Sequence, residues 1–200
     1  MENWGAAEIN SYLNDFNSFL RNIKLTDFES RDIELHDGIK RTIDLILALG
    51  KSGGTLIFIG NGGSAAIASH QATDFIRSCG IKAFAPLDHS LLTCMGNDHG
   101  YEHVFSEPLK VIAKKEDVLM AISSSGRSAN IIRAVQNMRE RKLKIITLSG
   151  FNPDNPLRKS GDVNFYVPSN SYRIVESAHL FICNWILDFT LRSKEALKEI

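Results

Sequence analysis

The segment 55–75, TLIFIGNGGSAAIASHQATDF, limits the fold of this chain more than any other. Residues 55–59 are apolar and rich in β-forming side chains, so they predict a short buried strand. Three of the next four residues, 60–63, are glycines, and the lack of a Cβ lets the backbone turn sharply and approach a ligand closely. Ser64 is a favoured N-cap, and the alanine-rich residues after it predict a helix over 64–78. A strand, a glycine-rich turn and a helix N-terminus with free N–H groups together form a candidate anion site.

This turn differs from the common nucleotide-binding motifs. No Gly-Lys-Ser/Thr follows it, and the GxGxxG spacing is absent, so no nucleotide cofactor is expected. His70 and Asp74 stand at i and i+4 of the predicted helix and therefore share one face. An anion site followed by such a pair suggests an enzyme that acts on a phosphorylated small molecule. The alternative is a glycine-rich turn that serves packing alone.

Composition sets the class of protein. With 200 residues, of which 44% are hydrophobic and 23% charged, the chain is expected to form one soluble domain. The formal net charge of +0 gives no reason to expect nucleic acid or a membrane as a partner. Cys79, Cys94 and Cys183 are widely spaced without a CxxC, which predicts reduced core thiols. The first ten residues, MENWGAAEIN, have no apolar h-region, and no apolar run approaches the length of a membrane span, so we expect a cytoplasmic location.

Strands and helices alternate after two leading helices. Amphipathic spacing predicts helices over Trp4–Ile23 and about Ser30–Leu49, with a turn or cap at Thr26-Asp27 between them. These two helices could pack against another subunit or cover a sheet edge. The remaining pattern predicts a parallel, doubly wound sheet of five strands with helices on both faces, in which ligands bind at the carboxyl ends of the strands. The predicted strands are 55–59, 82–85, 117–122, 143–148 and 164–167, and the helices are 64–78, 90–96, 103–113, 128–141 and 171–191.

A second candidate anion site follows the predicted strand 117–122. The sequence there is SSSGRS, at 123–128, and a predicted helix begins at its end. Serine hydroxyls beside the free N–H groups of a helix N-terminus suit a phosphate, and Arg127 could add charge. Serine clusters also serve simply as turn and cap residues. Two such turns after two parallel strands favour the anion site.

Taken together, three motifs carry a family resemblance. GNGGS at 60–64, LTCMGND at 92–98 and ISSSGRS at 122–128, in this order, resemble the sugar isomerase (SIS) domain and most closely its phosphoheptose isomerase branch. The resemblance covers nearly the whole chain and implies a single SIS domain over 1–200, with 1–50 as a helical segment that packs on the domain and on neighbouring subunits. It further implies a flavodoxin-like sheet, a homotetramer with sites between subunits, and a sugar phosphate as the ligand. The positions that would bind or shape the substrate are Asn61, Gly62, Gly63, Ser64, Asp88, Asn97, Asp98, Ser123, Ser124, Ser125 and Ser128.

The expected acid–base residues depart from the pattern of the family. Where the family has a His and a Glu four residues later, this chain has His70 and Asp74. Where the last helix of the family has a Gln and a His eight residues later, this chain has Glu176 and Asn184. By this comparison Asp74 or Glu176 would move the proton and His70 would polarise the substrate oxygens.

The same side chains could also form a zinc site. His70, Asp74 and Glu176, with His179 one turn after Glu176, could bind Zn²⁺ through two nitrogen and two oxygen ligands. They could equally share protons without a metal, and His179 could be a hydrogen-bonded core histidine.

Three functions follow from the resemblance. The first is an isomerase that converts sedoheptulose 7-phosphate to D-glycero-D-manno-heptose 7-phosphate through an enediol, for nucleotide-activated heptose synthesis in capsule or lipopolysaccharide formation. The second is a non-catalytic protein that binds a sugar phosphate or a partner. It follows because an asparagine at the position of Asn184 resembles the related DnaA initiator-associating protein, which works by binding. The third is an isomerase of another phosphosugar, since serine turns recognise phosphate and not chain length.

Overall fold

The computed structural model describes residues 5–198, with side chains described up to 196. Trp4, the predicted start of the first helix, lies outside the described residues. The helices are α1 (Ala6–Arg21), α2 (Leu35–Ser52), α3 (Gly63–Cys79), α4 (His89–His99), α5 (Ser106–Ile112), α6 (Ala129–Glu140) and α7 (Tyr172–Lys198), with 3₁₀ turns η1 (Tyr101–His103) and η2 (Pro156–Lys159). The strands are β1 (Lys24–Thr26), β2 (Asp32–Ile33), β3 (Leu56–Gly60), β4 (Ala83–Phe84), β5 (Val118–Ser123), β6 (Lys144–Ser149) and β7 (Val163–Tyr166).

One mostly parallel sheet runs through the described chain, in the order β2-β1-β7-β6-β5-β3-β4. The five predicted strands are β3 to β7, and they pair with one another in parallel. The prediction of five strands is corrected to seven, because β1 pairs antiparallel with β7 and β2 pairs antiparallel with β1. The second predicted helix therefore begins at Leu35 and not at about Ser30, and Thr26 belongs to a strand. Strands of three and two residues are too short to give a readable alternation of apolar and polar residues.

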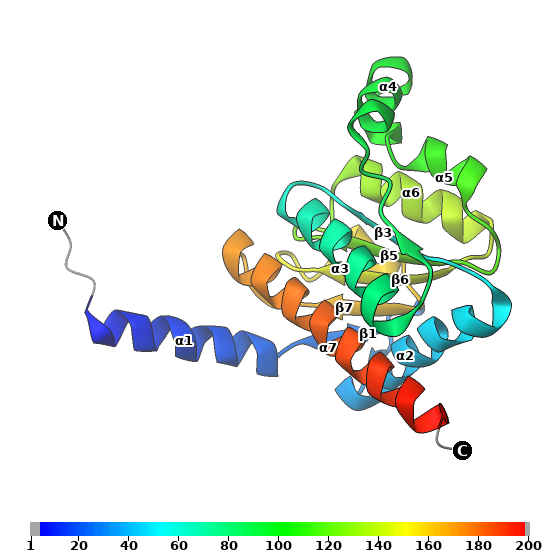
Figure 1. Cartoon of the computed structure of the whole chain (residues 1–200). Coiled ribbons are helices and arrows are strands. Elements are labelled where there is room, and N and C mark those ends of the chain that lie inside the picture. The colour runs from blue at the N-terminus through cyan, green and yellow to red at the C-terminus, as the bar shows by residue number, and fades with distance from the viewer. Residues whose placement is uncertain (1–4, 199–200) are drawn as a thin grey trace.

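Helices cover both faces of the sheet, as predicted (Figure 1). Alternate residues along β3 enter opposite cores: Leu56 and Phe58 pack in one, Ile57 and Ile59 in the other. The first core includes apolar residues of α2, α3 and α7, and the second includes residues of α5 and α6. All five residues of β3 are buried, which explains its continuous apolar sequence.

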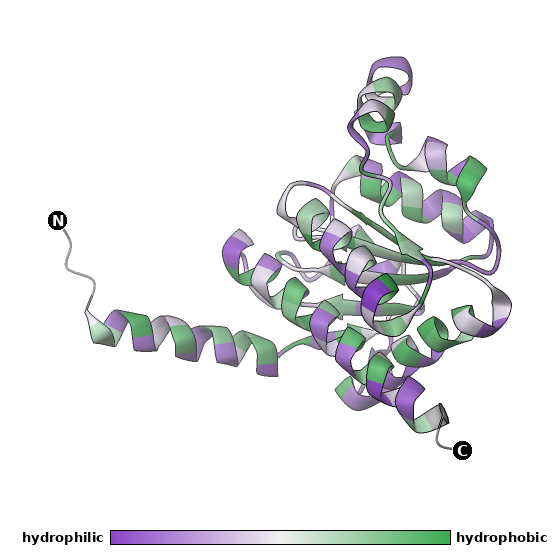
Figure 2. Ribbon diagram, viewed as in Figure 1, coloured by the Kyte–Doolittle hydropathy of each residue, from purple (hydrophilic) through white to green (hydrophobic). Residues whose placement is uncertain are grey.

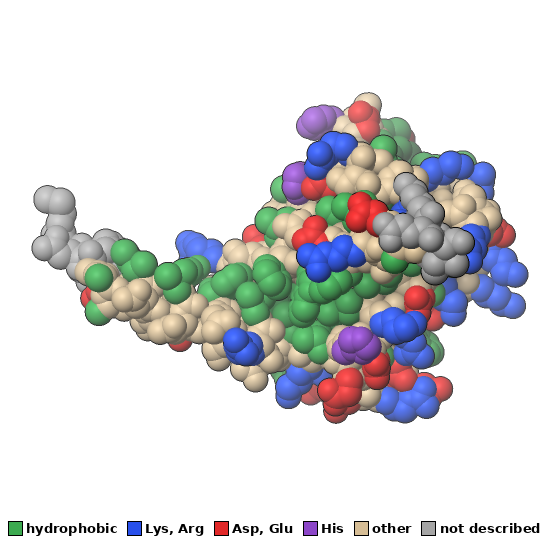
Figure 3. Space-filling view, turned by 60° about the horizontal axis from the view of Figure 1, so that its bottom comes forward, with side chains coloured by type: hydrophobic (Ala, Val, Ile, Leu, Met, Phe, Trp, Pro, Cys, Tyr) green, Lys and Arg blue, Asp and Glu red, His purple; other side chains and the backbone are tan. Residues whose placement is uncertain are grey.

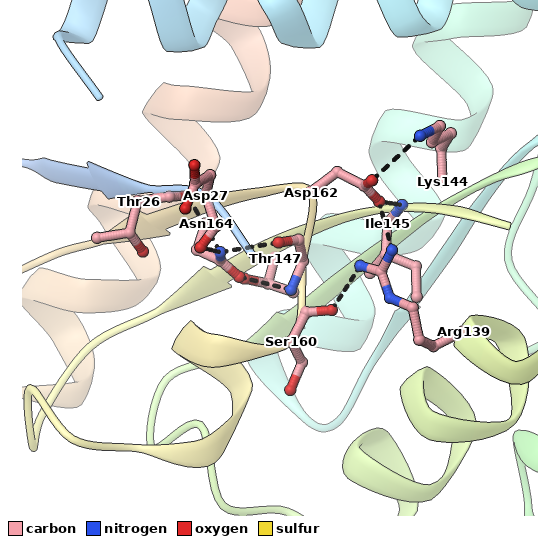
Figure 4. A network of polar contacts seen from close by, with 10 residues as sticks. Thr26, Asp27, Arg139, Lys144, Ile145, Thr147, Ser160, Asp162 and Asn164 are labelled. Carbon is pink, nitrogen blue, oxygen red and sulfur yellow. Dashed lines mark hydrogen bonds and ion pairs between the residues drawn. The ribbon is translucent and has the colours of Figure 1, made fainter. Parts of the chain in front are cut away.

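A buried amide connects the antiparallel edge to the parallel sheet (Figure 4). The side chain of Asn164, on β7, is fully buried and accepts hydrogen bonds from the Thr147 hydroxyl and from the Gly161 N–H, both at 2.7 Å. Its Nδ2 donates to the carbonyls of Thr26 and Asp27 at 3.1 and 3.2 Å. One side chain thus links β6, β7 and the end of β1.

Helix α1 extends away from the body of the molecule (Figure 1). None of its residues is buried, and Ile9, Tyr12 and Leu13 are each more than half exposed. Polar and apolar residues alternate along it in Figure 2, as in an amphipathic helix.

Between α2 and α7 lies an apolar groove of about 820 Å³. Its lining includes Leu35, Ile39, Ile43, Trp185 and Phe189. Figure 3, which brings the lower side of Figure 1 forward, shows apolar side chains gathered on one face.

Two further sequence predictions can be compared with this fold. Cys79 and Cys183 are buried free thiols, but Cys94 is exposed on α4, so the prediction of three core thiols is corrected to two. Among the described helices, the stretch Tyr172–Ala196 of α7 is long and apolar enough to cross a membrane by length and composition alone. Half of its most apolar window is buried inside the protein, as expected for a helix packed on the sheet.

Candidate active site

Both predicted anion-binding turns lie at the point where the order of the parallel strands reverses. From β3 the chain first adds β4 on one side and then β5 on the other. Because Gly60 pairs with Ile122, the glycine-rich turn and the serine turn leave neighbouring strands side by side. Between them is a pocket of about 230 Å³, the kind of place where ligands bind in open α/β sheets. It is lined by Asn61, Gly62, Gly63, Ser64, Ser123, Ser124, Ser125, Ser128, Tyr172 and Glu176.

Glycine is required at two positions of the first turn. Gly62 has φ +52° and precedes α3 as its N-cap, a backbone conformation that other residues rarely adopt. A Cβ on Gly63 would overlap the carboxylate of Glu176, which comes from α7. The missing side chains therefore leave the first N–H groups of α3 open and let a carboxylate approach the turn closely.

The serine turn offers hydroxyls that the protein itself uses little. Ser128 is the N-cap of α6 but makes no side-chain capping bond, and its Oγ lies 3.3 Å from Oγ of Ser123. Ser123 and Ser124 are each only 4% exposed, and the buried Ser124 hydroxyl has no partner among the described residues. Unpaired buried hydroxyls are costly, so this arrangement favours a ligand with acceptor oxygens. The N-termini of α3 and α6 meet at the same pocket and together favour an anion.

Helix α7 adds Glu176 and Tyr172 to the pocket. Tyr172 lies one helical turn before Glu176, and its ring packs edge-on against Phe151 at 4.6 Å between ring centroids. Tyr172 is not among the site residues predicted from the sequence, although its spacing of four residues from Glu176 indicates a shared face.

His70 and Asp74 interact with each other but do not line this pocket. Nε2 of His70 lies 3.2 Å from Oδ2 of Asp74, and a nitrogen of Arg77 lies 3.3 Å from Oδ1 of the same carboxylate. The His70 side chain is 61% exposed. His70 is seven positions after Gly63, the first residue of α3, which is about 10 Å along the helix axis. The predicted pair therefore forms on one helix face, at a distance from the anion pocket of its own chain.

The predicted residues Asp88, Asn97 and Asp98 lie around α4, outside the pocket lining. Asp88 is the N-cap of α4; hydrogen bonds from the Ser90 hydroxyl and from the N–H of Leu91 lower the pKa of its carboxyl. Asp98 accepts a bond of 2.8 Å from the Asn97 amide, and this bond lowers the pKa of Asp98. These side chains are exposed, and α4 stands apart from the sheet (Figure 1).

His179 is a core residue. It is fully buried, one ring nitrogen lies 3.3 Å from the carbonyl of Ser149, and the other has no partner among the described residues. Burial lowers its pKa to about 4, so the imidazole is neutral at pH 7. Asn184 stands where the family has a histidine, and its Oδ1 accepts a hydrogen bond of 2.6 Å from the side-chain amide of Gln71 on α3.

The predicted zinc ligands do not come together within one chain. No group of three or more His, Cys, Asp or Glu side chains suited to a metal occurs among the described residues. His70 and Asp74 form a pair on α3, Glu176 lines the pocket, and His179 lies in the core. These residues do not fit a zinc site in a single subunit.

A parallel sheet with a glycine-rich turn and a serine-rich turn around one pocket, where the strand order reverses, defines an α/β protein with a site suited to a small anionic ligand. The chain belongs to the SIS domain family, whose model matches residues 25–150. Its relatives include a phosphoheptose isomerase of Enterobacter sp. (strain 638), 34% identical over 180 residues that cover 87% of this chain and 92% of the relative. A phosphoheptose isomerase of Hamiltonella defensa is 38% identical over 153 residues, covering 74% and 73% of the two chains.

Solved structures agree with this placement. The phosphoheptose isomerase GmhA of Neisseria gonorrhoeae superposes with a TM-score of 0.79 at 28% identity, covering 92% of this chain and 97% of that one. The resemblance to the phosphoheptose isomerase branch, predicted from three motifs, is thereby confirmed.

Proposed function

We propose that this chain is an isomerase that interconverts sedoheptulose 7-phosphate and D-glycero-D-manno-heptose 7-phosphate, feeding nucleotide-activated heptose synthesis in capsule or lipopolysaccharide formation. The observation that carries the proposal is the pocket where two phosphate-type turns meet a carboxylate, in a chain whose relatives are phosphoheptose isomerases. The order of the five parallel strands, with its reversal at β3, also supports the flavodoxin-like class.

In this proposal the phosphate binds between the N-termini of α3 and α6. Ser64, Ser123, Ser124, Ser125 and Ser128 donate hydroxyl hydrogens to its oxygens, and the free N–H groups of both helices add to them. The unpartnered Ser124 hydroxyl supports this arrangement.

Glu176 is the proposed base, because it is the carboxylate in the pocket lining. Its carboxylate takes a proton from C1 of the ketose while O2 gains one, which gives the enediol. A proton is then delivered to C2 as O1 loses one, which gives the aldose. Asp74 is the alternative base. Because the His70–Asp74 pair lies outside the pocket of its own chain, it would act only in the pocket of a neighbouring subunit.

We infer further that the protein is a cytoplasmic homotetramer with 1–50 packed on the domain and on neighbouring subunits. A helix of 16 residues without a buried side chain, such as α1, is marginal alone in water, and the apolar groove between α2 and α7 is also uncovered. A zinc ion would need ligands from a second subunit beside His70 and Asp74, so no step here depends on a metal.

The test is incubation with sedoheptulose 7-phosphate in D₂O, followed by NMR, with and without added Zn²⁺. A new anomeric signal with deuterium at C2 is the expected result. Glu176→Gln should lower kcat by at least about 10²-fold, the usual contribution of a general base, with the oligomer intact. Full turnover in that variant would refute the role of Glu176. If the sugar phosphate raises the melting temperature of the unaltered protein but is not converted, the result would favour a non-catalytic binding protein or an isomerase of another phosphosugar.

A further inference from the structure

Two asparagines connect the glycine-rich turn to the serine turn. Asn61 follows β3, and Asn130 is the second residue of α6. Nδ2 of Asn61 donates to Oδ1 of Asn130 at 2.9 Å, and Nδ2 of Asn130 donates to Oδ1 of Asn61 at 2.8 Å. Among the described side chains, these are the hydrogen bonds that join the glycine-rich turn to the start of α6, the helix that follows the serine turn.

The orientation of both amides is fixed by their neighbours. The N–H of Ile131 donates to Oδ1 of Asn130 at 2.9 Å, so that oxygen cannot exchange places with the nitrogen without losing a bond. Nδ2 of Asn130 must then face an acceptor, which Oδ1 of Asn61 provides. The hydroxyl of Tyr101, on η1, donates to the same Oδ1 at 3.2 Å.

This pairing changes what Asn61 can do. Its oxygen accepts two hydrogen bonds and one of its two amide hydrogens is donated to Asn130, so its side chain has little capacity left for a ligand. Asn130 is only 2% exposed and does not line the pocket. The amide groups of Asn61 and Asn130 are therefore used mainly to bond to each other and not to a ligand.

The location explains why a connection is needed there. The ladder between β3 and β5 ends with Gly60 opposite Ile122, and both chains then leave the sheet as turns. A single phosphate has to meet both turns at once, and hydrogen bonds weaken steeply when donors are displaced. A pair of part-buried hydrogen bonds between side-chain amides, just beyond the last ladder position, would hold the two helix N-termini at a constant separation.

We propose that Asn61 and Asn130 form a clamp that sets the spacing of the two turns for one phosphate group, with Asn130 as a positioning residue. The proposal rests on the proposed function, since it assumes that the pocket binds phosphate. The Tyr101 hydroxyl extends the clamp to η1, because it adds a hydrogen bond from the segment after α4 to the Asn61 side chain.

Asn130→Ala tests the clamp through affinity and not through stability alone. We expect the Kd for inorganic phosphate and the KM for sedoheptulose 7-phosphate to rise together by about tenfold, about 1.4 kcal/mol, with kcat changed by less than about threefold. Asn61→Ala should give a similar rise, and the double variant should be no worse than either single one, because both remove the same pair. Asn130→Ser, which removes the amide but suits a helix N-terminus, replaces the alanine variant if that one does not fold.

Thr147→Val is the matched control. It removes a buried hydrogen bond to Asn164 and lowers stability, but it touches neither turn. Its KM and phosphate Kd should stay unchanged. Unchanged phosphate affinity in the Asn130 and Asn61 variants, or additive losses in the double variant, would overturn the clamp alone. Failure of the unaltered protein both to bind phosphate and to turn over the sugar would overturn the proposed function and the clamp with it.

Discussion

The buried His179 should make the stability of this protein depend strongly on pH below neutrality. Its pKa is about 4 in the folded protein and 6.5 in the reference state, because burial disfavours the charged imidazolium. The unfolded chain thus binds a proton more readily, and stability falls as pH decreases from about 6.5 toward 4. The difference of about 2.5 between the pKa values corresponds to about 3.4 kcal/mol in full, of which about 2 kcal/mol is lost by pH 5. Above about pH 7 His179 contributes no pH dependence.

His179→Gln isolates this contribution. Glutamine can still donate to the carbonyl of Ser149 but does not titrate. Urea unfolding at fixed protein concentration, at pH 8, 7, 6 and 5, gives the free energy of unfolding of both proteins. The difference between them should shift by about 2 kcal/mol in favour of the variant between pH 8 and pH 5. His36→Gln is the control at an exposed histidine, whose side chain is 87% exposed, and it should not reproduce this shift. A difference between unaltered protein and His179→Gln that stays constant over this range would refute the assignment of a neutral core histidine.

Two other substitutions test the fold and the assembly. Asn164→Ala removes a fully buried amide and leaves backbone groups of Thr26, Asp27 and Gly161 unpaired, so the free energy of unfolding should fall by about 3–5 kcal/mol in urea titrations. Asn152→Ala, at an exposed amide that accepts one bond from Asp154, should cost less than about 1.5 kcal/mol, and an equal loss in both would contradict the central role of Asn164. Leu13→Asp, on the exposed apolar face of α1, should split the proposed homotetramer into smaller species by light scattering, whereas Ser11→Asp on the opposite face should not. A tetramer unchanged by Leu13→Asp would exclude this face from the interface.

Local sequence determined the parallel part of the fold and the two turns of the site. Strand 55–59 was predicted within one residue of β3, and helix 64–78 within one residue of α3 at each end. Apolar runs, glycines and N-cap serines act on their immediate neighbours, so their effect is readable without the tertiary structure. The serine turn at 123–128 was predicted for the same reason.

Tertiary packing decided which polar side chains share a pocket. The i, i+4 spacing placed His70 and Asp74 on one face of α3, but periodicity does not indicate what that face meets, and the pair lies outside the pocket that Glu176 lines. Glu176 and His179 are three residues apart on α7, yet one reaches Gly63 and the other is enclosed in the core.

Local sequence is therefore enough to predict an α/β fold and the two turns that border the pocket, because those features depend on contacts between near neighbours. The pairing of Asn61 with Asn130 and the position of Tyr172 in the pocket depend on tertiary contacts. The two asparagines are 69 residues apart, and nothing in the local pattern of either indicates the other. They meet because β3 and β5 are neighbours in the sheet, and that pairing depends on the packing of the whole domain.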